Sequence, residues 1–537
     1  MGRSRGLGVV GAGVMVAALC VAGGVSAAPA TGSTGSLAGE FGSTGLGSTN
    51  PEPENPEPSP DDKYRQQFFE NFVGGPLSNC FFSHGAVGKS PLTNKAFPDA
   101  GAVYWATTFV RPPGSKVEIE GIYPQSRFMA YNAYDKAGLP VDGVADYMID
   151  PDEGSVNTFR EGAARYGTSE DQRKYTVEVR LAAKPADIEL NQEAGQPPRN
   201  YFYSMPSKNQ WFKEGSGLPI ESVMYRVYVP DEGLDIAGGS PMATAKVTLA
   251  DGTVLRGQQA CDILGSNPKG PEEVNLPNFS AIQMDPKAYQ EMAHPPGVSN
   301  YFPAKYPADW RAQYDPAYNK DMWSTNPIDY SDPSVPTPPR TGGSYYPNVF
   351  NTYLRTIVNR NLGKVVVVRA KAPTTVQTLR NEPTYSEKDA QLRYWSYSLS
   401  ESQATTAVMD GVHDEQFPLD GDGYYTLVIS RAEDRPQFAT KECGVAWAEW
   451  SKRGDGAGNP DFGWLSLRNM MANPDFEQSL FDTKRPGDER EVLGEYYPEL
   501  KYYTDAAALD ALGCDGVATN EVVADIPTKG SPDAKGW

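Results

Sequence analysis

Two similar strand-like segments place an arginine beside large aromatic rings, a combination that could bind an anionic ligand. Arg127 and Tyr131 belong to one segment, and Arg393, Trp395 and Tyr397 belong to the other. Because alternate residues of a strand point to the same face, each arginine shares a face with its aromatic neighbours. A guanidinium at the mouth of a β-sandwich could hold an anion through two hydrogen bonds. The alternative is that each arginine pairs with an acid inside the fold.

Two acidic turns are candidates for a calcium site, because Ca²⁺ prefers oxygen ligands on loops. One turn holds Asp420 and Asp422, and the other holds Asp455, Asn459 and Asp461. Neither turn fits the EF-hand pattern, since the required spacing of ligand residues is not kept and no glutamate follows at the end of the loop. Ordinary Asp-Gly turns share this composition. Calcium is the one cofactor that the sequence suggests, and no other is expected.

The sequence offers no recognisable catalytic set. A serine hydrolase needs a serine, a histidine and an acid in one place, and the three histidines are far apart in the sequence. A glycosidase needs two carboxylates. With 68 acidic residues in the chain, the sequence can neither identify nor exclude such a pair. The 30 tyrosines and 9 tryptophans would suit stacking on sugars, although cores account for most of them.

The formal charge of −20 over 537 residues disfavours nucleic acid as a partner, because an acidic chain repels phosphate backbones. Residues 1–27 match a signal peptide, with two arginines, an apolar stretch and a small-x-small end at Val25-Ser26-Ala27. We therefore expect a secreted or envelope-associated protein with no membrane span after cleavage. Residues 28–62, rich in Gly, Ser, Pro and Glu, predict a disordered spacer.

The cysteines that remain after cleavage are even in number and lie in an oxidising location, so two disulfides are predicted. They are Cys80, Cys261, Cys443 and Cys514. Four cysteines allow three pairings. We favour Cys80–Cys261 and Cys443–Cys514, because each bond would stay within one half of the chain.

Short β-type runs separated by turns continue from about residue 63. Val117-Glu118-Ile119-Glu120 alternates apolar and polar residues, which is the period of a half-buried strand. The second half repeats the first: four residues recur at the same separation of 249 positions. They are Tyr104, Thr107, Arg111 and Gly114, which recur as Tyr353, Thr356, Arg360 and Gly363. An internal duplication is the simplest explanation.

The predicted fold is mainly β, with two tandem antiparallel β-sandwich or jelly-roll-like domains at residues 63–265 and 341–515. Residues 266–340, rich in proline and aromatic rings, are expected to form an ordered connector, because exposed rings forgo favourable burial. Residues 516–537 are expected to form a flexible tail.

Three runs resemble a bacterial family called domain of unknown function twelve-fourteen. Arg393-Tyr394-Trp395-Ser396-Tyr397-Ser398-Leu399 is similar to its aromatic-Trp-Ser strand, and the run from Arg127 to Asp135 is a looser copy without the tryptophan. The run from Glu221 to Pro230 is similar to its terminal Arg-x-Tyr-x-Pro strand. The resemblance implies a jelly-roll-like fold present twice and no particular activity.

These observations favour a secreted or envelope protein that binds an extracellular ligand or partner through tandem β domains. Carbohydrate of the cell wall is one candidate ligand. The alternative is a secreted hydrolase that acts on polysaccharide or ester substrates.

Overall fold

The alternation of apolar and polar residues produces the strands of the first half. In β3 (Lys116–Ile122), Val117 and Ile119 are fully buried, whereas Glu118 and Glu120 lie on the other, partly exposed face. Strands of this kind form a sheet with one face toward a core. The computed structural model describes residues 73–75, 77–88, 94–165, 167–190, 193–270, 273, 283–295, 304–322, 324, 327–330, 332–340, 346–378 and 390–519. The predicted signal peptide and spacer lie outside these residues.

Ten strands of the first half form two five-stranded sheets. Sheet A has the order β1-β2-β8-β4-β5 and sheet B the order β10-β9-β3-β6-β7. All pairs are antiparallel except β6 with β7. Besides β3, the strands are β1 (His84–Val87), β2 (Ala102–Phe109), β4 (Ser126–Tyr134), β5 (Pro140–Ala145), β6 (Lys174–Ala183), β7 (Tyr201–Met205), β8 (Glu221–Pro230), β9 (Thr244–Thr248) and β10 (Val254–Arg256).

The second half forms two more sheets with a corresponding strand order. Sheet C runs β11-β12-β18-β14-β15, and sheet D runs β17-β16-β13-β19. The parallel pair β16 with β17 occupies the place of β6 with β7. The strands are β11 (Arg311–Ala312), β12 (Asn351–Asn359), β13 (Val365–Lys371), β14 (Leu392–Ser400), β15 (Val408–His413), β16 (Tyr424–Ser430), β17 (Ala446–Glu449), β18 (Phe462–Ala472) and β19 (Glu499–Tyr503). The prediction of a mainly β fold is confirmed.

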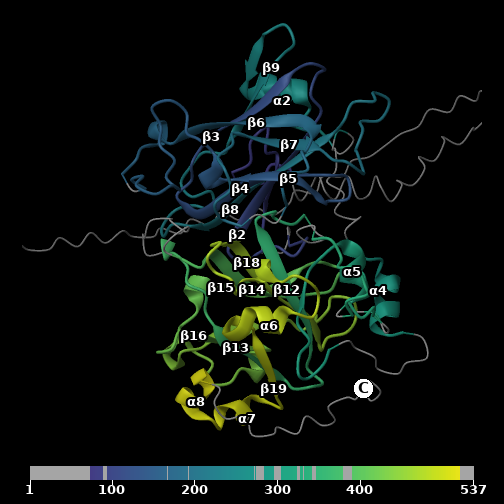
Figure 1. Ribbon diagram of the computed structural model, residues 1–537, viewed down its shortest axis with the longest axis vertical. Helices are drawn as coiled ribbons and strands as arrows, with labels where there is room; N and C mark the ends of the chain where they lie inside the picture. Colours follow the sequence, from purple (N-terminus) through teal and green to yellow (C-terminus); the bar gives the residue numbers. More distant parts are fainter. Residues whose placement is uncertain are drawn as a thin grey trace, which may run out of the picture. The chain divides into compact units, whose positions relative to one another are not determined.

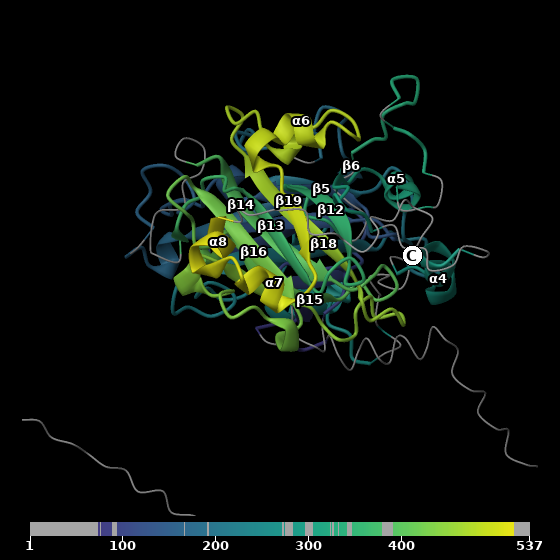
Figure 2. The same cartoon turned by 90° about the horizontal axis from the view of Figure 1, so that it is seen from below.

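The described helices are short and lie between or after the strands. They are α2 (Gly257–Leu264), α4 (Pro286–Ala293), α5 (Pro316–Asp321), α6 (Glu489–Leu493), α7 (Ala506–Asp510) and α8 (Gly513–Thr519). Figure 2 shows α7 and α8 beside the strands of sheet D. Helix α8 includes the first residues of the predicted tail. None of the helices in the described part of the chain has the length and apolar character needed to cross a membrane.

The described part of the connector packs against the second half. Helices α4 and α5 each begin with an aspartate cap followed by proline, a strong helix-starting combination. Tyr289, Trp310 and Tyr318 are buried in the same core as the strands of sheets C and D. Their burial accounts for the aromatic richness of this region.

Each sheet pair encloses its own core, and sheets A and C face each other. Tyr131 of sheet A meets Tyr175 of sheet B, and Tyr397 of sheet C meets Tyr425 of sheet D. Between sheets A and C, the rings of Tyr228 and Tyr394 lie 5.3 Å apart. Figure 1 shows β4 and β8 on one side of this interface and β14 and β18 on the other. All four strands are buried along almost their whole length.

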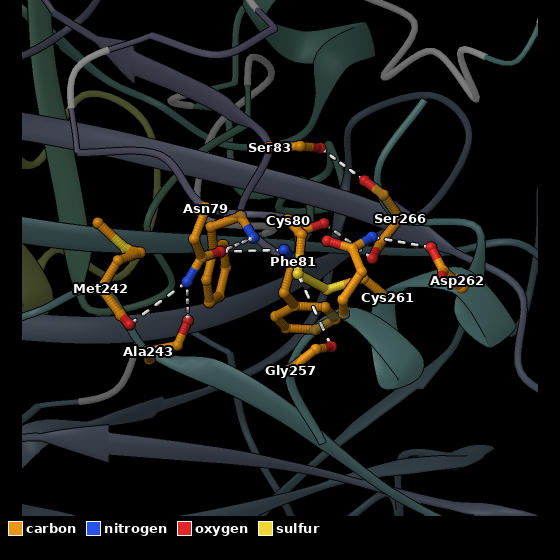
Figure 3. The surroundings of a disulfide bond; sticks show 12 residues. Asn79, Cys80, Phe81, Ser83, Met242, Ala243, Gly257, Cys261, Asp262 and Ser266 are labelled. Atoms are coloured by element: carbon orange, nitrogen blue, oxygen red, sulfur yellow. Dashed lines mark hydrogen bonds between the residues drawn. A yellow bond between two sulfur atoms is a disulfide. The ribbon is translucent and has the colours of Figure 1, made fainter. Parts of the chain in front are cut away.

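The two disulfides join Cys80 to Cys261 and Cys443 to Cys514, which are the pairings that the sequence favoured. Cys80 precedes β1 and Cys261 lies in α2, so the first bond fastens the edge of sheet A to that helix. Figure 3 shows the hydrogen bonds around it, among them Ser266 Oγ to the Cys80 carbonyl at 3.0 Å. The second bond joins a 3₁₀ turn (Lys441–Cys443) to α8.

His84, buried in β1, should make the protein sensitive to acid. Burial lowers the pKa of His84 to about 4, and a bond to the Ala106 carbonyl only partly offsets this effect. The unfolded chain, with a histidine pKa of about 6.5, takes up the proton first, so stability is lost as pH falls from about 6.5 to about 4. The expected loss is about 3 kcal/mol in total.

Urea unfolding of the wild type and of His84→Gln across this pH window checks the expectation. The variant should lose less stability per pH unit than the wild type, because it lacks the group that titrates. Parallel slopes for the two proteins would refute the assignment.

Candidate functional site

The predicted aromatic site residues lie inside the two sheet pairs. The hydroxyls of Tyr131 and Tyr175 are 2.7 Å apart, and those of Tyr397 and Tyr425 are 2.6 Å apart. Burial raises the pKa of Tyr131 and of Tyr397 well above the usual value, so both stay neutral. Trp395 donates its indole N–H to the Pro373 carbonyl at 3.1 Å and borders a hollow of only about 10 Å³. These rings therefore act as core residues.

The two predicted arginines meet between sheets A and C, and each pairs with acids from the other half of the chain. Arg127 binds Asp414 at 2.7 Å and also binds Glu415. Arg393 lies 3.3 Å from Asp146. Each guanidinium also donates to the other arginine's backbone carbonyl at 3.2 Å. The arginines thus pair with internal acids, and they link the two halves.

The two pairs differ in electrostatic balance. Burial raises the pKa of Asp414, but Arg127 and His413 outweigh this effect, and the net pKa is lowered. At Asp146 burial outweighs the more distant Arg393, and the net pKa is raised. Asp414 is therefore held firmly as an anion, whereas Asp146 is a weaker counter-charge.

The predicted calcium residues lie in two separate groups. Asp420 pairs with Arg369 and accepts the backbone N–H groups of Asp422 and Tyr424, which closes its turn. The Asp422 side chain is exposed.

In the second group, buried Asp455 accepts the Tyr289 hydroxyl at 2.9 Å and the Asn459 backbone N–H at 3.0 Å. The Asn459 side chain contacts His294, and Asp461 pairs with Arg360 and Arg431. No group of three or more acids, histidines or cysteines in the described residues is placed to hold a metal ion.

A cavity of about 40 Å³ lies between sheets A and C. Tyr104, Arg226 and Tyr228 line it from sheet A, and Tyr353 and Arg468 line it from sheet C. The strand registers place Arg226 opposite Tyr104 and Arg468 opposite Tyr353, so the two sides correspond. Both arginines are almost fully buried. A buried cation is costly unless it is paired, which makes this cavity the strongest candidate site.

Two segments cross between the halves and cover the cavity. The first arm (residues 94–99) bonds to the second half: the Phe97 N–H donates to the Thr406 carbonyl at 2.7 Å, and the Phe97 carbonyl accepts from Arg468 at 2.7 Å. The second arm (residues 346–350) bonds to the first half, where the Tyr346 carbonyl accepts from Arg226 at 2.6 Å. Each arm therefore supplies a carbonyl to the other half's arginine.

Backbone strain gathers around these arms. Ala96, Phe97 and Tyr346 have φ of 64°, 51° and 49°, in the left-handed region that non-glycine residues rarely adopt. All three line the cavity, and Thr406, at φ 57°, binds the first arm. Such residues cluster at ligand sites because the surroundings must hold them in place. The strain therefore supports a functional role for the cavity.

The tyrosines around the cavity supply no negative charge near neutral pH. Burial raises the pKa of Tyr104 well above its usual value and that of Tyr228 to about 12. They can donate or accept hydrogen bonds, and their ring faces stabilise cations. The ring centre of Tyr104 lies 5.4 Å from the guanidinium carbon of Arg226. The ring centre of Tyr353 lies 5.7 Å from the guanidinium carbon of Arg468.

Arg226 and Arg468 are not among the site residues that the sequence predicted. Both lie in strands that are buried on both faces. No alternation of polar and apolar residues therefore indicates that these arginines face away from the core of their own sheet pair. The signal that could have found them is the internal repeat, because each arginine lies opposite a repeated tyrosine, Tyr104 or Tyr353.

Fold and site together define a mainly β protein with a small cavity between two sheet pairs, which two buried arginines line. No family model and no curated protein matches the chain. Among solved structures, an uncharacterised protein from Burkholderia cenocepacia is similar at 11% identity, with a TM-score of 0.38 over 82% of this chain and 86% of that one. The VPA0106 protein from Vibrio parahaemolyticus is similar at 12% identity, with a TM-score of 0.31 over 82% of this chain and 96% of that one.

Proposed function

We propose that this is an extracytoplasmic binding protein that holds a small ligand in the cavity between sheets A and C. One observation carries the proposal: both halves supply a buried arginine and a strained arm to the same small cavity. The lining residues include three cationic side chains, Lys95, Arg226 and Arg468, and no carboxylate. This lining favours binding over the hydrolase alternative, which needs an acid or a nucleophile beside the substrate.

The volume limits the ligand. Pockets for drug-sized molecules hold roughly 300–1,000 Å³, whereas this cavity has about 40 Å³. A sugar would not fit unless sheets A and C moved apart. A carbohydrate ligand would therefore use an outer surface, such as the groove of about 330 Å³ that Tyr424, Tyr497 and Lys501 line on sheet D.

Ligand capture tests the proposal with the full chain purified under oxidising conditions. We expect native mass spectrometry of gently prepared protein to show a bound small molecule, and the same molecule to raise the thermal midpoint. At 100 times its dissociation constant, a ligand adds about 2.7 kcal/mol of stability.

Arg226→Met and Arg468→Met should lose this ligand, whereas an outer-surface control, Lys452→Met, should keep it. The proposal would be overturned if the wild-type protein retained no small molecule and bound neither small molecules nor cell-wall polysaccharides. Release of product from polysaccharide or ester substrates would favour the hydrolase.

We also propose that the two sheet pairs are divergent copies of one domain and that they belong to the family which the sequence resembles. The corresponding strand orders and the matched arginine–tyrosine pairs support the duplication. Secretion through the predicted signal peptide remains part of this proposal, and two disulfides are compatible with it.

A further inference from the structure

The two arms carry different residues at one corresponding position. Asp99 lies five residues before Tyr104, and Asn348 lies five residues before Tyr353. Their local geometry matches: Asp99 Oδ1 accepts the Gly101 N–H at 2.9 Å, and Asn348 Oδ1 accepts the Phe350 N–H at 3.3 Å. One copy thus has a carboxylate where the other has a neutral amide.

This difference leaves one arginine without a counter-charge. Arg468 lies 3.3 Å from the carboxylate of Asp99. Arg226, which corresponds to Arg468, is 1% exposed, and its acceptors among the described residues are all neutral: the Asn132 side chain, the Tyr134 hydroxyl and the Tyr346 carbonyl. Among the described residues, no acid lies within ion-pair distance of Arg226.

Two donors at this side of the cavity are also without acceptors. In the described part of the chain, Arg226 Nε and Asn348 Nδ2 are buried and have no hydrogen-bond partner. Both residues line the cavity. An unpaired N–H on the uncompensated cation and a second one on Asn348 call for an acceptor that carries negative charge.

Neutral partners satisfy this requirement incompletely. The rings of Tyr104 and Tyr134 lie 5.4 Å and 5.5 Å from the guanidinium carbon of Arg226, but cation–π attraction is weaker than the cost of desolvating an ion. A water molecule in the cavity would leave the charge in place. The cavity has room for more than one water, since one water needs about 10–15 Å³ and the volume is about 40 Å³.

We propose that the cavity binds a small monoanion of a few non-hydrogen atoms, with a carboxylate or similar oxyanion group held by Arg226 and Asn348. This inference rests on the proposed function and names its ligand class. The anion supplies beside Arg226 the charge that Asp99 supplies beside Arg468. It is not held in an identical cage, because Phe128 and Ala130 occupy the positions of Tyr394 and Ser396, whose hydroxyls bind Asp99.

Calorimetric titration of the full chain tests the inference with sodium formate and sodium acetate, after exhaustive dialysis into gluconate buffer. Formamide and acetamide serve as neutral controls of the same shape. We expect one site for formate or acetate and at least tenfold weaker binding of the matching amide.

Variants at the two corresponding positions give opposite expectations. Asn348→Asp should weaken anion binding at least tenfold and raise the thermal midpoint of the anion-free protein, because it installs the internal carboxylate. Arg226→Met should abolish binding. Asp99→Asn should create a second site and raise the stoichiometry from one toward two.

Several outcomes would overturn the inference. They are the absence of binding by either anion, equal binding of acid and amide, and unchanged affinity in Asn348→Asp with its fold intact by circular dichroism. A neutral extracellular molecule that binds where formate and acetate do not would keep the proposed function and refute the anion. Anion binding without any captured extracellular ligand would keep the anion and refute the proposed function.

Discussion

Replacing Arg127 by methionine is expected to destabilise the protein by about 3–5 kcal/mol, because it removes the arginine that two buried acids share. The side chains of Asp414 and Glu415 are each 2% exposed where they bind Arg127. Methionine preserves much of the arginine's length, so packing changes little and the electrostatic effect dominates. Denaturant unfolding at pH 7, extrapolated to water, measures the loss.

Two further variants separate the charge from other effects. Arg393→Met should cost less than Arg127→Met, since Asp146 is a single acid whose pKa is already raised by burial. Arg127→Met combined with Asp414→Asn and Glu415→Gln should recover part of the loss, because it removes the stranded charges. An Arg127→Met protein within about 1 kcal/mol of the wild type would show that the pairs do not hold the halves together.

The strands with one exposed face could be predicted from the sequence. The alternating run from Val117 indicates β3. The aromatic residues predicted beside Arg127 and Arg393 as part of a ligand site lie in the cores of the two halves. Local periodicity is enough for such strands, because each side chain responds to one buried face.

The interface between sheets A and C could not be predicted in the same way. Strands β4 and β14 are buried on both faces, so period two vanishes from their pattern. The acid that pairs with Arg127 lies 287 residues further along the chain, where no local rule connects them. The cavity lies between the same two sheets, so its lining residues come together only in the folded chain.

Opening the disulfide between Cys80 and Cys261 is expected to cost about 5 kcal/mol in the chain-entropy model, since it closes a long loop. Its sequence separation is 181, against 71 for Cys443–Cys514, for which the same model gives about 4 kcal/mol. Cys261 is 1% exposed within α2, so its replacement also loosens the packing of that helix in the core of the first half.

Cys80→Ser/Cys261→Ser and Cys443→Ser/Cys514→Ser provide the matched comparison by denaturant unfolding. The first double variant should be the less stable one, and it should also weaken β1, which lies next to Cys80 at the edge of sheet A. The second should leave anion binding unchanged, because its cysteines join a turn and a helix beside sheet D and do not line the cavity. The reverse order of stability would mean that packing around α8, and not loop closure, sets the contribution of these bonds.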